Sequence, residues 1–103
     1  MAWTKLATIG ELQRDSVIEV EHHGSLYAIC NAGGEIRALS GVCPHQGGPL
    51  GQGTVIRGLL VCPWHMWEFD SVNGACLVDE SLRIPTYRVK VEDEAVLVEL
   101  PDA

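Results

Sequence analysis

Short apolar or alternating runs recur along the chain, with turn residues between them. Between residues 87 and 92, tyrosine and valine alternate with arginine, lysine and glutamate, as a half-buried strand requires. Runs of this kind are typical of β-strands when glycine-, asparagine- or proline-containing segments bound them. They occupy residues 17–21, 26–30, 35–40, 54–57, 59–62, 87–92 and 95–100, so the sequence predicts an all-β fold.

Helices are hard to place in this chain. No window of ten residues keeps a period of 3.6 without glycine, proline or a strand-like alternation, and residues 11–15 are expected to form one turn at most. The 103 residues provide one core and leave no room for a second catalytic domain. We therefore expect a single domain over residues 1–103.

The charge balance argues against some classes of binding partner. Seven basic and fourteen acidic residues give a formal net charge of −7, which would repel nucleic acid and an anionic membrane surface. The excess of acidic residues near the end of the chain could steer a basic protein partner or could be a solvated tail. The sequence has neither a leader-like start nor an apolar segment of about 18 residues, and a cytoplasmic protein without a membrane anchor is expected.

Four side chains with metal-binding chemistry lie in two segments. The first segment, residues 41–53, is GVCPHQGGPLGQG, and its glycines and prolines favour a loop that holds Cys43 and His45. The second segment, CPWHMWEFD, holds Cys62 and His65. Two thiolates and two imidazoles suit tetrahedral zinc or an iron–sulfur cluster with mixed ligands. Zinc is the weaker alternative, because each segment offers one cysteine and one histidine rather than a cysteine knuckle and a histidine-bearing helix.

CPHQGG and CPWH, at this separation, resemble the two cluster loops of Rieske [2Fe-2S] proteins. The resemblance extends to the ending SLRIPTYRVKVEDEAVLVEL, which is similar to the closing strands of Rieske ferredoxins. It implies a Rieske iron–sulfur fold, an antiparallel β-sandwich with an inserted cluster-binding subdomain at about residues 41–85. It also implies one [2Fe-2S] cluster, with Cys43 and Cys62 on one iron and His45 and His65 on the other. Pro85 corresponds to a proline-bearing segment that covers one side of the cluster in that family.

The residues around these loops predict a low reduction potential. The resemblance places Gly48 and Trp64 where high-potential members of the family have a loop-bracing disulfide, and Trp67 and Phe69 where they have hydroxyl donors. Without such donors near sulfur, the reduced and more negative cluster is less stabilised. We expect a potential toward the negative end of the Rieske range of roughly −150 to +300 mV.

Several apolar residues are candidates for a docking rim around the cluster. We expect Trp64 to form such a rim with Pro44, Leu50 and Pro63, whereas Met66 could belong either to the rim or to the core. Many relatives have glycine where Met66 stands. Outside the loops, Cys30 and Cys76 are predicted to be buried free thiols, and His22 and His23 to lie at a solvated hairpin tip.

The resemblance implies a one-electron carrier that transforms no substrate itself. Its expected partners are a flavin-dependent reductase and a terminal oxygenase of the aromatic-ring-hydroxylating dioxygenase type, each bound transiently. The alternative is a small Rieske subunit of an oxidoreductase such as nitrite reductase. A complete oxygenase is excluded by length, since no downstream domain could hold a mononuclear iron.

Overall fold

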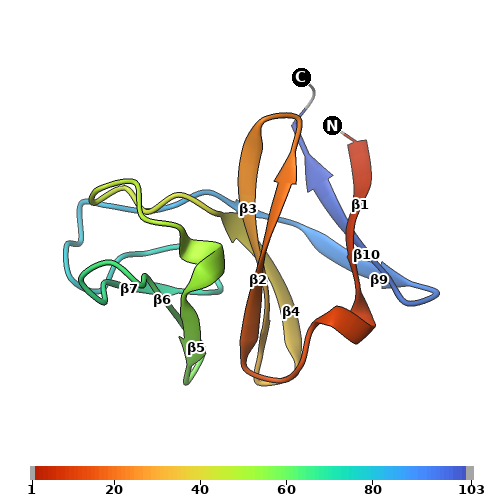
Figure 1. The fold of residues 1–103 in the computed structure, drawn as a ribbon, viewed down its shortest axis with the longest axis horizontal. Coiled ribbons are helices and arrows are strands. Elements are labelled where there is room, and N and C mark those ends of the chain that lie inside the picture. The colour runs from red at the N-terminus through yellow and green to blue at the C-terminus, as the bar shows by residue number, and fades with distance from the viewer. Residues whose placement is uncertain (1, 102–103) are drawn as a thin grey trace.

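The computed structural model describes residues 2–101, which form three antiparallel β-sheets (Figure 1). The first sheet has the order β1 (Ala2–Thr8), β10 (Ala95–Leu100) and β9 (Val89–Glu92). The second has the order β2 (Ser16–His22), β3 (Ser25–Ala32), β4 (Glu35–Ser40) and β8 (Thr86–Tyr87). The third comprises β5 (Thr54–Ile56), β6 (Leu59–Val61) and β7 (Glu68–Asp70). The prediction of an all-β fold is confirmed.

Several element boundaries differ from those predicted. Strands β1 and β7 were not predicted, and the single strand expected over residues 87–92 is divided at Arg88 into β8 and β9. The helical turn expected at residues 11–15 lies earlier, as the 3-10 turn η1 (Ile9–Glu11), and a second turn, η2 (Leu50–Gln52), was not predicted. Of the described helices, none is both long and apolar enough to cross a membrane.

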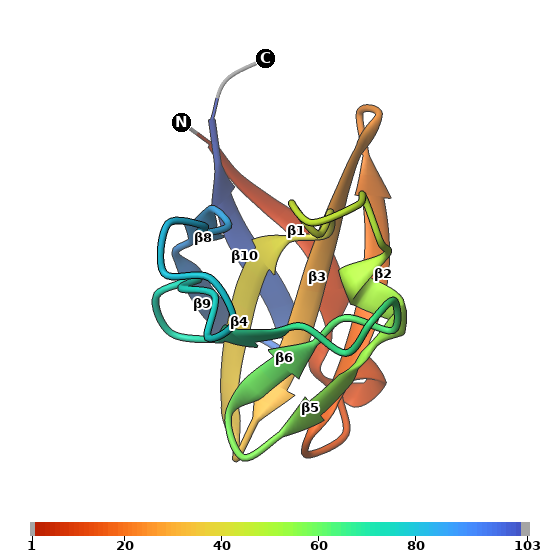
Figure 2. The ribbon, with the colours of Figure 1, turned by 90° about the vertical axis from the view of Figure 1, so that its left-hand side faces the viewer.

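The first and second sheets pack against each other and enclose one core. Ile29 and Ala38 of the second sheet are buried with Val96 and Val98 of the first. Figure 2, seen from the side of the third sheet, shows β5 and β6 in front of β3 and β4, with β10 behind them. The two packed sheets confirm the predicted antiparallel sandwich.

Strand β3 has a core on each of its faces. Ile29 faces the sandwich core, whereas Ala28 and Cys30 belong to a second core that includes Leu60 and Phe69 of the third sheet. Side chains alternate between the two faces of a strand, so a strand buried on both faces reads as a continuous apolar run. This explains the unbroken run LYAIC and confirms that Cys30 is a buried free thiol.

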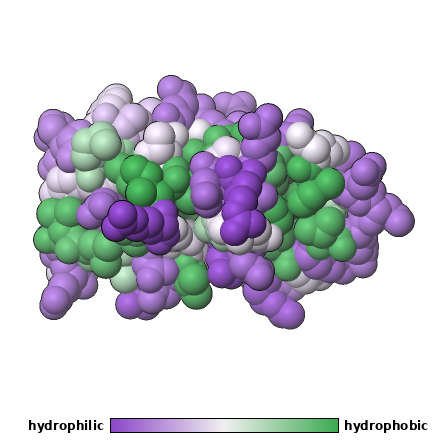
Figure 3. Space-filling view, turned by 90° about the horizontal axis from the view of Figure 1, so that it is seen from below, coloured by the Kyte–Doolittle hydropathy of each residue, from purple (hydrophilic) through white to green (hydrophobic). Residues whose placement is uncertain are grey.

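Residues 41–85 leave and re-enter the second sheet at adjacent points. Strand β4 pairs with β8 through Leu39 and Thr86, and the Ser40 N–H donates to the Pro85 carbonyl at 2.9 Å. The intervening residues form a lobe that projects to the left in Figure 1 and contains the third sheet. Figure 3 shows hydrophobic surface at this end of the molecule and also on the opposite half of the same face.

Candidate functional site

The first predicted loop is closed by backbone hydrogen bonds. An isolated β-bridge joins Val42 to Pro49. Inside it, the Cys43 N–H donates to the Gly48 carbonyl at 2.9 Å, and the Gly47 N–H donates to the Cys43 carbonyl at 2.8 Å. These bonds hold the Cys43 side chain in the interior, where it is buried, and leave His45 partly exposed.

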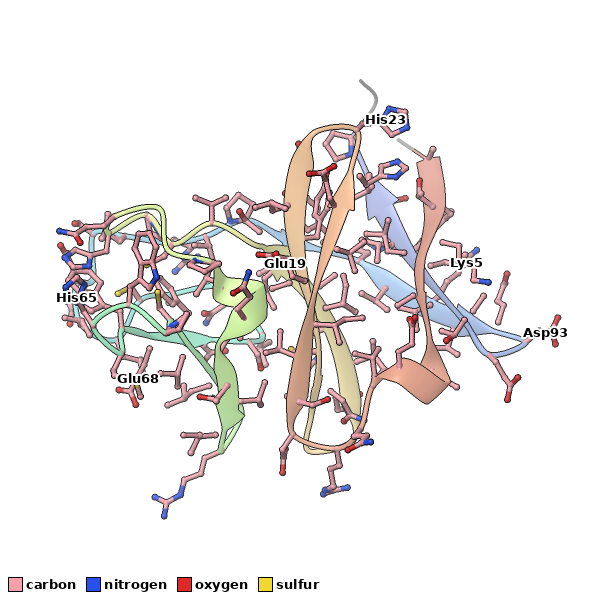
Figure 4. All side chains as sticks on the ribbon, in the orientation of Figure 1. Lys5, Glu19, His23, His65, Glu68 and Asp93 are labelled. Carbon is pink, nitrogen blue, oxygen red and sulfur yellow. The ribbon has the colours of Figure 1, made fainter. Side chains whose placement is uncertain are left out.

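The second predicted loop spans residues 62–67. The Cys62 N–H donates to the Trp67 carbonyl at 2.8 Å, and the Trp64 N–H lies 3.4 Å from the Cys62 sulfur. His65 and Met66, which follow, have φ angles of 66° and 58°. Two consecutive residues in this left-handed region reverse the chain, so that the exposed His65 side chain lies at the far end of the lobe (Figure 4).

The two loops bring the predicted ligands together in two pairs. The ring centroids of His45 and His65 are 5.1 Å apart, with the planes inclined at 78°. The thiols of Cys43 and Cys62 are neighbours. Burial raises the pKa of the Cys62 thiol, the hydrogen bond from the Trp64 N–H opposes that rise, and the neighbouring Cys43 thiol adds to it. The sulfurs therefore lie in a desolvated interior and the imidazoles lie toward its outer end.

One nitrogen of the site lacks a partner. Nδ1 of His45 is buried and makes no hydrogen bond. A buried polar atom without a partner is uncommon in folded proteins and requires an explanation. Coordination through this nitrogen provides one, because a neutral imidazole offers a lone pair to a metal. The donor set of two thiols and two imidazoles thus fits the predicted cluster.

Gly48 and Trp64 bring the two loops into direct contact. A Cβ atom built on Gly48 would lie 2.7 Å from the Cys62 sulfur and 3.2 Å from the Cβ of Trp64. All four cysteines, including Cys43, are free thiols. The contact between the two loops at this point is therefore made by Gly48 and the tryptophan side chain, without a disulfide.

The residues predicted to surround the cluster differ in their exposure to solvent. Trp64 and Met66 are 48% and 61% exposed, and Pro44 and Pro63 are exposed as well. Leu50 was wrongly placed in the rim: it is 0% exposed because η2 packs it into the lobe core.

Two more of these residues have defined positions. Trp67 is partly buried and stacks on His45. Pro85 is exposed, and its carbonyl bonds to Ser40 where the lobe joins the second sheet.

Leu77 and Val78 are exposed apolar residues that the sequence analysis missed. They are 54% and 55% exposed, and the Leu77 N–H donates to the carbonyl of Glu68, the residue that follows Trp67, at 2.9 Å. The signal in the sequence was the apolar segment ACLV at residues 75–78, of which only Cys76 was considered. Cys76 of the same segment is a buried free thiol, as predicted.

The predicted hairpin tip lies far from the lobe. His22 pairs with Ser25 at the end of the β2–β3 hairpin, and His23 is exposed in the turn, as expected. Figure 4 shows His23 and His65 on different parts of the molecule.

Comparison with known sequences identifies relatives along most of the chain. Residues 2–88 match the Rieske [2Fe-2S] domain. The ferredoxin subunit of a methanesulfonate monooxygenase from Methylosulfonomonas methylovora is 29% identical, over 94% of this chain and 80% of that protein. The ferredoxin component of the naphthalene 1,2-dioxygenase system from Pseudomonas aeruginosa is 28% identical, over 95% of each. A 4beta-methylsterol monooxygenase from Methylococcus capsulatus is 34% identical over 87% of this chain, but the match spans only 27% of that protein.

Solved structures share the fold. The complex of reduced oxygenase and oxidized ferredoxin in carbazole 1,9a-dioxygenase contains a chain that matches with a TM-score of 0.85 and 22% identity, over 93% of this chain and 91% of that one. A putative small subunit of an NADPH nitrite reductase matches with a TM-score of 0.81 and 22% identity, over 97% and 100%. Together with the match over residues 2–88, this places the chain in the Rieske [2Fe-2S] family, whose domain binds a single [2Fe-2S] cluster.

Proposed function

We propose that this chain is a Rieske-type ferredoxin, an electron carrier rather than an enzyme. In this proposal it takes single electrons from a flavin-dependent reductase and passes them to a terminal oxygenase of the aromatic-ring-hydroxylating dioxygenase type. The observation that carries the proposal is the placement of a histidine pair and a cysteine pair by the same two loops of the lobe. The match to a dioxygenase ferredoxin component over 95% of both proteins supports the same function.

We assign the ligands by pairs. Cys43 and Cys62 would hold one iron, and their adjacency in the buried interior supports this. His45 and His65 would hold the other, supported by their 5.1 Å centroid separation and by the unpartnered Nδ1 of His45. Residues 41–85 would then form the cluster-binding subdomain, with Pro85 at its boundary.

The mixed ligands favour uptake of an electron. When bound, a [2Fe-2S] cluster supplies one ferric–ferrous couple, so that a single electron enters and leaves without a bond to substrate being made. Two thiolates and two neutral imidazoles bring two fewer negative charges than four thiolates would. The ligand charges therefore repel the added electron less strongly than those of an all-cysteine site would.

Residues next to the ligands support a potential in the lower part of the Rieske range. Phe69 is buried and Trp67 stacks on His45, and neither side chain offers a hydroxyl to the sulfurs. The Trp64 N–H, 3.4 Å from the Cys62 sulfur, is a backbone donor that remains. We expect a midpoint potential near the negative end of the range of roughly −150 to +300 mV.

The exposed end of the lobe is the proposed contact surface for both partners. His65 is exposed there, and the apolar side chains of Trp64, Met66, Leu77 and Val78 would form a docking rim around it. The crystallised complex of a carbazole dioxygenase ferredoxin with its oxygenase supports an oxygenase as one partner. A reducing cytoplasm, which we propose as the location, would keep such thiol ligands from oxidation.

A nitrite reductase subunit is the second candidate function. Its support is a likeness of fold at 22% identity, whereas the dioxygenase ferredoxin component matches at 28% over nearly the whole of both chains. Gel filtration with candidate partners separates the two functions, because a subunit stays in a standing complex and a shuttle dissociates.

Replacement of His65 by cysteine tests the ligand assignment. We expect His65→Cys to remove one histidine nitrogen coupling from the electron paramagnetic resonance spectrum of the reduced protein. The potential should fall, because a thiolate adds negative charge. His23→Cys, in the exposed hairpin turn, is the matched control and should leave both unchanged. Wild-type couplings in His65→Cys would remove His65 from the site.

A further inference from the structure

Trp67 and His45 stack on each other although they belong to different loops. Their ring centroids are 3.9 Å apart and the planes are inclined by only 10°. Trp67 ends the second loop, where its carbonyl accepts the hydrogen bond from the Cys62 N–H at 2.8 Å. The indole is therefore anchored next to one predicted ligand while it covers the ring of another.

The stack determines how the His45 ring is oriented. Rotation about the χ2 bond of histidine is soft, so an imidazole needs contacts to fix its plane. Ligating histidines usually gain this from a hydrogen bond at the ring nitrogen that does not bind the metal. For the His45 ring the observed contact is the stack on Trp67. The face of the ring lies on Trp67, and the ring of His65 meets it at 78°. Aromatic rings of the second loop thus hold a side chain of the first.

We propose that Trp67 is a positioning residue for His45. Its indole fixes the imidazole plane with Nδ1 directed into the buried site, and it excludes water from the covered face. With Trp64, which packs against Gly48, it joins the two loops where no disulfide does so. This inference rests on the proposed role of His45 as a ligand.

Removal of the indole should have two separable effects. The His45 ring would gain rotational freedom, which changes the coupling of its nitrogen to an unpaired electron on the bound iron. Water would also reach the uncovered face. Water stabilises the more negative reduced state, so the potential should rise. A tryptophan that only filled space would affect stability and leave the nitrogen coupling unchanged.

The experiment uses the full cluster-loaded chain and three variants. Trp67→Leu removes the stacking ring, Trp67→Phe keeps a smaller one, and Trp3→Leu changes a tryptophan that lies by Lys90 on the first sheet. Pulsed electron paramagnetic resonance measures the histidine nitrogen couplings of the reduced protein, and film voltammetry measures the potential. The decay of visible absorption on heating measures cluster retention.

We expect Trp67→Leu to shift or broaden one of two nitrogen couplings, to raise the potential and to lose the cluster several-fold faster. Trp67→Phe should shift the same quantities in the same direction by less, and Trp3→Leu should match the wild type. Unchanged couplings and potential in Trp67→Leu would overturn the inference. If Trp67→Leu does not retain a cluster, Trp67→Phe decides, and wild-type couplings there would overturn it. A wild-type protein without histidine nitrogen couplings would instead overturn the ligand proposal itself, and this inference with it.

Discussion

Gly48 lies so close to Cys62 that a Cβ atom at position 48 would be 2.7 Å from the Cys62 sulfur. The same atom would be 3.2 Å from Cβ and Cδ2 of Trp64. Glycine is required at this point because the backbone of the first loop approaches the second at a distance that leaves no room for a side chain. The sulfur cannot move aside freely, since Cys62 is buried and is a proposed ligand.

Gly48→Ala should therefore disturb the ligand site. We expect the free energy of unfolding to fall by about 1–3 kcal/mol, the usual range for overpacking a filled site, and the cluster to be lost several-fold faster on heating. Gly10→Ala is the matched control, because a Cβ atom there has no neighbour within 4 Å. Denaturant unfolding and the visible spectrum measure the two effects. Equal stability of the two variants would show that the loops can separate without penalty.

Met66→Gly should stabilise the protein. Met66 has a φ of 58°, a left-handed conformation that costs an L-residue roughly 1–2 kcal/mol. Glycine avoids this strain but loses more entropy on folding, so we expect a net gain of up to about 1 kcal/mol in the free energy of unfolding. Met66→Ala removes the same exposed side chain without relieving the strain. A gain of the same size in Met66→Ala would contradict the backbone explanation.

The proposed docking rim predicts slower electron transfer without a change in potential. We expect Leu77→Ser to slow the anaerobic reoxidation of the reduced protein by its terminal oxygenase several-fold, because an apolar contact is lost. Val91→Ser replaces a similarly exposed apolar residue on β9 of the first sheet and should have no effect. Stopped-flow absorbance measures the rates. An equal decrease in both variants would place docking elsewhere.

Ionisation of Cys30 should lower the free energy of unfolding at alkaline pH. Burial raises the pKa of this thiol from 9.0 to about 11, while the charge of Arg37 opposes the rise. The folded state then keeps a proton that the unfolded state has released. The stability from this group is complete below pH 9 and is lost as the pH rises to about 11.

The expected loss is at most about 2–3 kcal/mol, given 1.36 kcal/mol per unit of pKa. Denaturant unfolding of the wild type and of Cys30→Ala at a series of pH values isolates this contribution as a difference. A difference that stays constant from pH 8 to pH 11 would show that the thiol ionises normally.

The strands that the sequence predicted well carry their own hydrophobic patterns. Strand β4 and strand β10 were predicted with their observed limits, and β2 and β3 differ by no more than two residues at either end. In β10 the burial alternates along the strand, so a period of two is visible locally. Such strands need no knowledge of their partners.

The missed strands depend on pairing between distant residues. In β1 only Ala7 is buried, and the strand is defined by its pairing with β10, with a register shift between Lys5 and Ala7. In β7, three residues long, only Phe69 is buried. The break at Arg88 arises because β8 pairs with β4 whereas β9 pairs with β10. A pattern along one segment contains none of this information.

The candidate site likewise has features that the sequence predicts and features that depend on tertiary packing. The spacing of cysteine and histidine pointed to four candidate ligands, because each pair lies within one loop, and their role as ligands stays a prediction. The burial of Leu50 depends on how η2 packs against the lobe core, and the stack of Trp67 on His45 depends on the relative placement of two loops. Both are tertiary features, and the residue types alone could not predict them.

The pairing of β4 with β8 brings the two ends of the lobe together. The chain departs at Ser40 and returns at Pro85, and a backbone hydrogen bond joins these residues. A segment whose ends meet can be inserted into, or transplanted between, larger proteins without rerouting the rest of the chain. The match to the 4beta-methylsterol monooxygenase covers 87% of this chain and 27% of that protein, so the matching region there is accompanied by additional sequence. The core that the lobe shares with β3 also ties the two parts together, so that a substitution at Ala28 or Cys30 would disturb both of them.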